Sequence, residues 1–169
     1  VGLGVAYRAM QANLFDHIVV LEKESVAGRH QSTHNSGVLH CGLYYQPGSL
    51  KAKLAVEGLA QMTEFCRRFD IDHEICGKIV LAVEESERER LSDLQQRGVK
   101  NGLQGLKWLE GDEIQEREPH AQGVAALLVP QEGIVDYRAV VDRLVSELTA
   151  AGHEVRTGME VTGVVEDGD

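Results

Sequence analysis

The chain has 169 residues, a length typical of one domain, and 43% of them are hydrophobic, which is enough for a core of ordinary size. Its net charge is −10, with only 17 basic residues. This balance argues against a general nucleic-acid partner, because phosphate binding needs a clustered basic surface, although a few groups could still hold one anionic ligand.

The first part of the chain predicts a helix, a strand, a long loop and a second helix. Apolar residues at helical spacing indicate a helix over residues 1–13, and the β-branched run at 17–22 is typical of a buried parallel strand. Residues 23–46 are rich in Gly, Ser, His and Asn and show little periodicity. Such long loops are uncommon in compact domains and usually functional. An apolar stripe then predicts a helix over 47–69.

The second part is richer in strands. The predicted elements, in chain order, are a strand pair at 72–76 and 78–83 broken at Gly77, a charged helix at 85–101, a strand at 106–109, a short helix at 111–118, strands at 124–129 and 133–135, an amphipathic helix at 137–151, and strands at 153–157 and 160–166.

This alternation predicts an α/β fold: a Rossmann-like dinucleotide-binding sheet with an inserted mixed β/α lobe. We expect residues 1–72 and 134–169 to form the nucleotide-binding part and residues 73–133 the inserted lobe. The chain has no initiator Met, opens directly on a helical pattern and stops at a turn-like tail after a strand pattern. We therefore expect both ends to be truncated and the fold to be incomplete.

Half of a dinucleotide-binding fingerprint is visible at the start of the chain. In that fingerprint the third glycine of GxGxxG opens the first helix, and an acidic residue about 20 positions later ends the next strand. Gly2 and Glu22 have this spacing. A carboxylate at Glu22 would accept hydrogen bonds from ribose hydroxyls and would repel a 2′-phosphate, which disfavours NADP.

Three histidines of the long loop, His30, His34 and His40, lie within eleven residues. Imidazole is a common metal ligand, but no nearby acidic or cysteine pattern completes a familiar site, so we expect no metal. The three cysteines, Cys41, Cys66 and Cys76, form no CxxC pattern and are expected to be reduced thiols of a cytoplasmic protein.

The loop and its flanks carry a resemblance to a known family. LEKE (21–24) followed by RHQSTHNSGVLHCGLYYQPGSLKA (29–52) closely resembles the L-2-hydroxyglutarate dehydrogenases and oxidases of the D-amino-acid-oxidase-like FAD superfamily. The resemblance continues through CGKIVLAV (76–83), EREP (116–119) and VPQEGIVDYRAV (129–140), so it covers nearly the whole chain.

The resemblance implies roles for individual residues. His40 would lie beside the flavin as the base, with covalent attachment to the flavin also left open, and Tyr44 and Tyr45 would approach the substrate. Val161 would lie on a strand at the adenine edge. The residues expected to bind FAD are Gly2, Glu22, Arg29, His30, Ser32, Asn35, Ser36, Gly37, Val38 and Val161.

The implied reaction is the oxidation of (S)-2-hydroxyglutarate to 2-oxoglutarate, with a quinone or oxygen as the electron acceptor. The protein would be cytoplasmic, with a peripheral contact at the inner face of the membrane. Two alternatives stay open: an FAD-dependent oxidoreductase for glycerol 3-phosphate or an amino acid, and a non-catalytic fragment.

Overall fold

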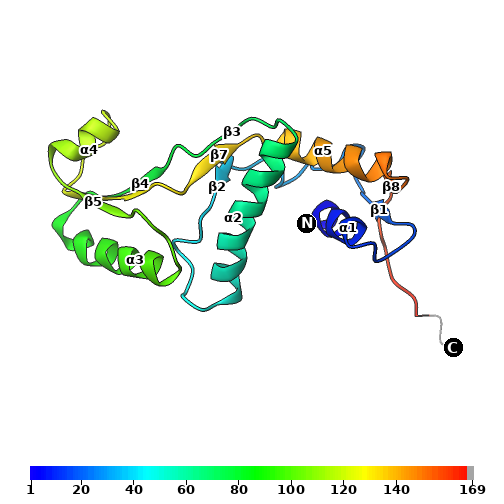
Figure 1. Ribbon diagram of the computed structural model, residues 1–169, viewed down its shortest axis with the longest axis horizontal. Coiled ribbons are helices and arrows are strands. Elements are labelled where there is room, and N and C mark those ends of the chain that lie inside the picture. The colour runs from blue at the N-terminus through cyan, green and yellow to red at the C-terminus, as the bar shows by residue number, and fades with distance from the viewer. Residues whose placement is uncertain (167–169) are drawn as a thin grey trace. The chain divides into compact units, whose positions relative to one another are not determined.

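The computed structural model describes residues 1–166, which form two compact units. The first unit comprises residues 1–36 and the segment from 136 onward, and the second comprises residues 37–135 (Figure 1). Each unit is described by itself below.

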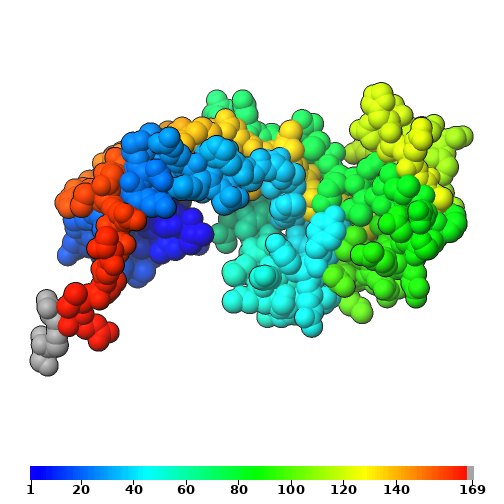
Figure 2. Space-filling model, turned by 180° about the vertical axis from the view of Figure 1, so that it is seen from behind, coloured from blue at the N-terminus to red at the C-terminus, as the bar shows by residue number. Residues whose placement is uncertain are grey.

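The first unit combines two helices with a two-stranded parallel sheet. Strand β1 (Val19–Leu21) pairs with β8 (Glu154–Arg156). Helix α1 (Gly2–Gln11) packs against α5 (Tyr137–Ala150). Residues near the start of the chain and residues 137–156 consequently lie side by side in this unit, as the blue and orange segments of Figure 2 show. Helix α5 begins at Asp136, whose carboxylate caps the helix by accepting from two backbone N–H groups.

The second unit holds two antiparallel sheets. In one of them, β7 (Gly133–Val135) lies between β2 (Val38–Leu39) and β3 (His73–Glu74). In the other, β6 (Ala125–Val129) lies between β4 (Lys78–Ala82) and β5 (Lys107–Leu109).

Helices complete the second unit. Helix α2 (Leu50–Arg68) begins after Ser49, whose hydroxyl accepts from the Ala52 N–H. A 3-10 turn, η1 (Glu85–Glu87), leads into α3 (Arg88–Lys100), and α4 (Asp112–Arg117) is short.

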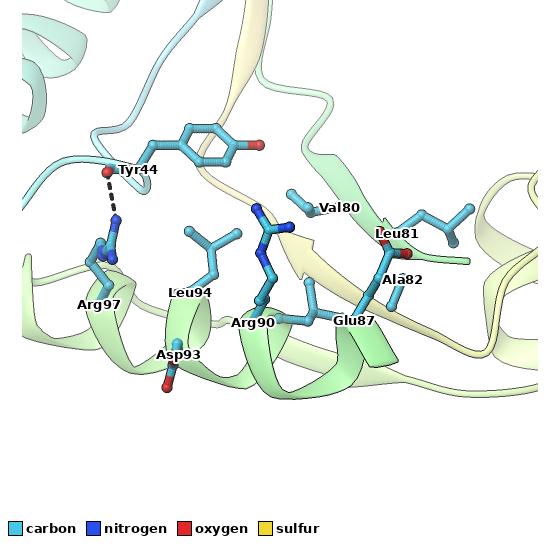
Figure 3. A pocket seen from close by; sticks show the side chains of 10 residues that line it. Tyr44, Val80, Leu81, Ala82, Glu87, Arg90, Asp93, Leu94 and Arg97 are labelled. Atoms are coloured by element: carbon cyan, nitrogen blue, oxygen red, sulfur yellow. Dashed lines mark hydrogen bonds between the residues drawn. The ribbon is translucent and has the colours of Figure 1, made fainter. Parts of the chain in front are cut away.

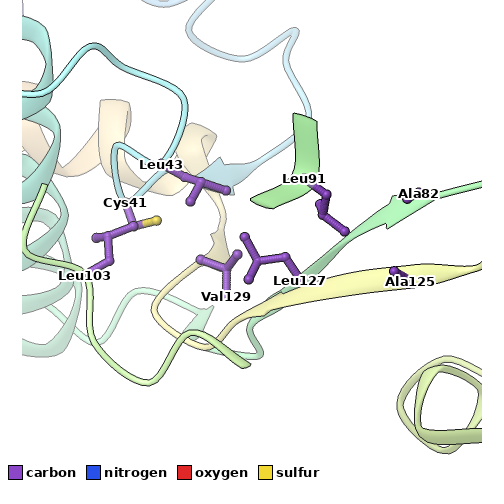
Figure 4. Close-up of a cluster of buried hydrophobic side chains, with 8 residues drawn as sticks. All are labelled: Cys41, Leu43, Ala82, Leu91, Leu103, Ala125, Leu127 and Val129. Carbon is purple, nitrogen blue, oxygen red and sulfur yellow. The ribbon is translucent and has the colours of Figure 1, made fainter. Parts of the chain in front are cut away.

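The main core of this unit packs α3 and the segment after β2 against the β4–β6–β5 sheet (Figure 4). Leu43 is fully buried there, and α3 approaches so closely at Gly98 that a Cβ at that position would lie 2.9 Å from Leu43 Cδ1. Such burial stabilises a side chain of this size by about 1.5–3 kcal/mol. The residues of the cluster are Cys41, Leu43, Ala82, Leu91, Leu103, Ala125, Leu127 and Val129.

The mixed α/β fold class is confirmed, and every predicted helix is present, but three strand predictions are wrong. Residues 160–166 form no strand, because no neighbouring strand among the described residues supplies hydrogen bonds to them. The segments at 72–76 and 78–83 do not pair with each other: β3 pairs with β7 and β4 pairs with β6. The loop predicted over 23–46 contains β2, which pairs with β7. The turn predicted at the C-terminus falls on residues 167–169, outside the described residues.

The compact units do not follow the predicted domain boundaries. The prediction puts residues 37–72, including α2, with the nucleotide-binding part, whereas the packing puts them in the second unit. Packing alone does not reveal which residues bind cofactor or substrate, so the predicted assignment of the two domains stays a prediction.

Candidate functional site

In the segment after β2, residues 40–45, buried residues at 41–43 lie between exposed residues at 40 and at 44–45. The backbone turns at Gly42, whose φ of +90° favours glycine and where a Cβ would lie 3.2 Å from Ala55 Cβ. Cys41 and Leu43 are fully buried, whereas His40 and Tyr44 are about half exposed. The buried residues therefore anchor the segment and leave the two polar rings at the surface.

The end of helix α3 holds this segment from the other side. The Asn101 side-chain amide donates to the carbonyl oxygens of Gly42 and Tyr45, both at 2.9 Å, and Arg97 donates to the Tyr44 carbonyl at 3.0 Å. The Tyr44 and Tyr45 backbone is thus fixed by hydrogen bonds from residues more than fifty positions away in the sequence.

Behind His40 lies a buried carboxylate. Glu132 precedes β7 and is only 1% exposed. Its Oε2 lies 2.5 Å from Lys78 Nζ and 3.6 Å from His40 Nδ1. Its Oε1 accepts from the Cys41 thiol at 3.3 Å and from the Cys41 N–H at 3.5 Å. A buried carboxylate is costly without partners, and here three residues supply them.

These contacts change the acidity of the neighbours of Glu132. Burial, followed by the negative charge of Glu132 and the hydrogen bond to it, raises the pKa of the Cys41 thiol to about 12. Burial alone would lower the pKa of Lys78, but the hydrogen bond and charge of Glu132, helped by Tyr44, outweigh burial and raise it. Lys78 therefore stays an ammonium and Cys41 stays a thiol at neutral pH.

Tyr44 connects this cluster to a pocket of about 450 Å³ between β4 and α3 (Figure 3). Lys78 Nζ lies 4.7 Å from the centre of the Tyr44 ring, a distance typical of a cation–π contact. The pocket wall has an apolar part and a charged part of mixed sign, so it shows no preference for anions or cations. Its charged members are Glu87, Arg90, Asp93 and Arg97.

In the first unit, Gly2 is the first residue of helix α1, and Glu22 directly follows strand β1. Gly2 opens α1, where an added Cβ would meet nothing within 4 Å, and the helix has no side-chain cap. Glu22 directly follows β1 and is half buried, and its Oε1 accepts from the Glu24 N–H at 2.9 Å. The first turn of α1 therefore has backbone N–H groups that no side chain caps.

The next residues form a turn-rich segment held by local hydrogen bonds. His30 bonds to Glu24 at 2.7 Å, which lowers the pKa of that carboxyl, and His34 Nδ1 lies 2.9 Å from the His30 carbonyl oxygen. Asn35 donates to the carbonyl of Ser32 at 3.0 Å, and Arg29 donates to the Ser25 hydroxyl at 3.4 Å. Arg29, His30, Ser32, Asn35 and Ser36 all have exposed side chains.

Three further residues are predicted to bind FAD: Gly37, Val38 and Val161. Gly37 has a φ of +70°, and its carbonyl oxygen accepts from the Val135 N–H at 2.8 Å. Val38 pairs with Ile134 in the β2–β7 ladder. Val161 is 60% exposed and lies on no strand, so the prediction that it belongs to a strand is wrong.

Sequence reasoning missed Glu132 and Lys78. Each stands beside a glycine at the start of an apolar strand, in the segments QEGIV and CGKIV. That pattern gives no hint that the two side chains meet, because 54 positions separate Lys78 from Glu132 in the sequence.

Residues 1–166 contain neither a metal-binding cluster nor a membrane-spanning helix. No group of three or more His, Cys, Asp or Glu side chains there could hold a metal ion. None of the helices in this part of the chain combines the length and the apolar character needed to cross a membrane.

Comparison with known proteins gives a consistent family. The whole chain, residues 1–169, matches the DAO family, described as FAD dependent oxidoreductase. It is 46% identical to the mitochondrial L-2-hydroxyglutarate dehydrogenase of Pongo abelii over 87% of the chain and 35% of that protein. It is 41% identical to the L-2-hydroxyglutarate dehydrogenase of Indibacter alkaliphilus over 97% of the chain and 41% of that protein. The chain thus spans about two fifths or less of the length of these relatives.

Solved structures agree on the fold. The FAD-bound L-alpha-glycerophosphate oxidase from Mycoplasma pneumoniae superposes with a TM-score of 0.84 at 25% identity, over 95% of this chain and 44% of that one. Glycine oxidase from Geobacillus kaustophilus superposes with a TM-score of 0.83 at 23% identity, over 99% of this chain and 45% of that one.

Proposed function

The chain belongs to the DAO family of FAD dependent oxidoreductases, and from this premise we propose that the whole protein oxidises (S)-2-hydroxyglutarate to 2-oxoglutarate. The observation that carries the proposal is the 38–46% identity to L-2-hydroxyglutarate dehydrogenases of animals and bacteria over most of the chain. The chain spans only part of the length of these relatives, so the reaction is proposed for the whole protein.

The residues of the first unit fit the adenosine and diphosphate parts of FAD. The uncapped first turn of α1 presents backbone N–H groups beside the Gly2 position, where no side chain blocks an approaching phosphate. Glu22 uses one carboxylate oxygen for the Glu24 N–H and would offer the other to a ribose hydroxyl. The next contacts to FAD would come from exposed side chains of the following loop: Arg29, His30, Ser32, Asn35 and Ser36. Gly37 and Val38, which come next in the sequence, would also contact FAD. Val161 would contribute its backbone.

His40 would act on the substrate hydroxyl. FAD, when bound, supplies the acceptor for the hydrogen and electron pair that leave C2. His40 would take the hydroxyl proton, and the C–O bond would become a carbonyl. A histidine suits this role because its ordinary pKa lies near neutrality. Tyr44 and Tyr45, which follow His40 in the sequence and have exposed rings, would border the substrate.

The electron acceptor and the location in the cell belong to the same proposal. We expect a quinone or oxygen to reoxidise the flavin, in a cytoplasmic protein that contacts the inner face of the membrane peripherally. The support is the resemblance alone, and reoxidation rates with a soluble quinone and with oxygen would decide between the acceptors.

A substrate panel on the full-length enzyme tests the proposed reaction. We expect (S)-2-hydroxyglutarate to give a higher kcat/KM than glycerol 3-phosphate, glycine or a D-amino acid, because the long loop match is to enzymes of that name. The measurement is steady-state kinetics with an artificial electron acceptor. A higher kcat/KM for glycerol 3-phosphate or for an amino acid would sink the substrate assignment while leaving the family intact.

A further inference from the structure

Glu132 is the one charged residue among residues 1–166 whose side chain is fully buried. Placing a carboxylate in such a site costs free energy that its partners must offset. The proposed reaction makes no use of Glu132, and Glu132 is not a member of the hydrophobic core cluster beside it. Its place directly behind the histidine that we assign as the base therefore needs an explanation.

The backbone around Glu132 is held in place by hydrogen bonds and close packing. The Glu132 carbonyl oxygen accepts from the Gly77 N–H at 2.8 Å, and the next residue, Gly133, pairs with Leu39 in the β2–β7 ladder. At Gly133 a Cβ would lie 2.2 Å from the Glu74 carbonyl oxygen, so the backbone is tightly enclosed. The side chain accordingly leaves a fixed backbone position.

The two carboxylate oxygens of Glu132 contact different partners. Oε1 faces the thiol and N–H of Cys41, and Oε2 faces Lys78 and His40. Lys78 neutralises the carboxylate and is itself covered on one side by the Tyr44 ring. Within the described part of the unit, the titratable or charged groups in contact with Glu132 are Lys78 from β4 and His40 and Cys41 from the segment after β2.

The distance to His40 has a chemical consequence. Nδ1 of the imidazole lies 3.6 Å from Oε2, and the ring is 53% exposed. Since Nδ1 faces inward to the carboxylate, Nε2 on the opposite side of the ring faces outward. A proton taken up by Nε2 makes the ring a cation beside the carboxylate, which stabilises it, as in other histidine–carboxylate pairs.

We propose that Glu132 is a positioning residue for His40: it turns Nδ1 inward, leaves Nε2 to receive the substrate proton and stabilises the imidazolium that results. The inference rests on the proposed function of His40 as the base. Lys78 limits the effect of the carboxylate, because it offsets the negative charge that His40 experiences.

Variants of the full-length enzyme separate this role from simple neutralisation of Lys78. Glu132→Gln keeps the shape and removes the charge, which leaves Lys78 as an unpaired cation near His40. We expect kcat to fall about 10–100-fold with FAD still bound, and the acid limb of the kcat/KM profile to move about one pH unit lower. Lys78→Met leaves the carboxylate alone with His40, so the same limb should move in the opposite direction.

Coupling to His40 provides the second measurement. In a His40→Asn background, Glu132→Gln should lower kcat by less than about threefold, because the group that it positions is gone. An equal loss in both backgrounds, or an unmoved acid limb in both single variants, would overturn the proposal. If Glu132→Gln alone does not fold, the neutral pair Glu132→Gln with Lys78→Met replaces it in this cycle, and an equal loss there overturns the proposal as well.

The titration of His40 can also be read without turnover. Carbon-13 NMR of histidine-labelled enzyme, with the His40 signal assigned from the His40→Asn variant, should show the imidazole titrating at lower pH in Glu132→Gln than in the unmodified protein. This shift is independent of the substrate. A failed substrate panel together with a clear NMR shift would therefore reject the reaction but keep the contact, and an absent shift would reject the contact itself.

Discussion

The two units hold their predicted site residues in different ways. In the second unit, the segment that carries His40 and Tyr44 is fixed by contacts across 59 residues from Asn101 and 91 residues from Glu132. In the first unit, the segment around His30 and Asn35 is held mostly by bonds to residues within six positions. Contacts between distant residues therefore fix the segment that carries the proposed base, whereas the predicted cofactor loop is shaped mainly by local hydrogen bonds.

Replacing one histidine in each of the two segments should give the largest difference in kcat. We expect His40→Asn to lower kcat of the full-length enzyme by about 10²–10⁴-fold while FAD stays bound, because it removes the proton acceptor. His34→Asn should keep kcat within about tenfold, because His34 contacts only nearby groups, the His30 carbonyl and Thr33. Steady-state kinetics with the flavin content measured in parallel checks both. If His34→Asn abolished turnover while His40→Asn kept full activity, the assignment of the base would be inverted.

The close packing of strand β7 predicts a loss of stability when Gly133 is replaced. At Gly133 a Cβ would lie 2.2 Å from the backbone oxygen of Glu74, and neither strand can move without breaking the β3–β7 ladder. We expect Gly133→Ala to destabilise the protein by about 3 kcal/mol, the upper end for overpacking. Gly58→Ala is the matched control: Gly58 lies inside α2 with open space around it, so the change should stabilise by up to about 1 kcal/mol.

Urea unfolding followed by circular dichroism would measure both glycine variants. Equal stability of Gly133→Ala and the unmodified protein would show that β7 and β3 are not packed as tightly as described.

The first unit predicts a smaller effect, on cofactor affinity. Glu22→Ala should weaken FAD binding by one or two charge-assisted hydrogen bonds, about 1.5–3 kcal/mol each. The control is Glu154→Ala on the adjacent strand β8, because Glu154 bonds to His17 and Arg156 and has no assigned ligand. Fluorescence titration of the apoenzyme with FAD measures both. Unchanged affinity in Glu22→Ala would remove this residue from the cofactor site.

The sequence by itself determined the helices, the strand–helix alternation, the Gly2 and Glu22 spacing and the family. Those features depend on periodicity, on local hydrogen bonding or on a contiguous string of residues, all of which are visible along the chain. Only the tertiary structure decided the rest. It paired β3 and β4 with different strands and brought Lys78 and His40 to one buried carboxylate at Glu132. It also left residues 160–166 without a partner strand among residues 1–166. Strand pairing and charge pairing depend on residues distant in sequence, and no local pattern encodes which of them meet.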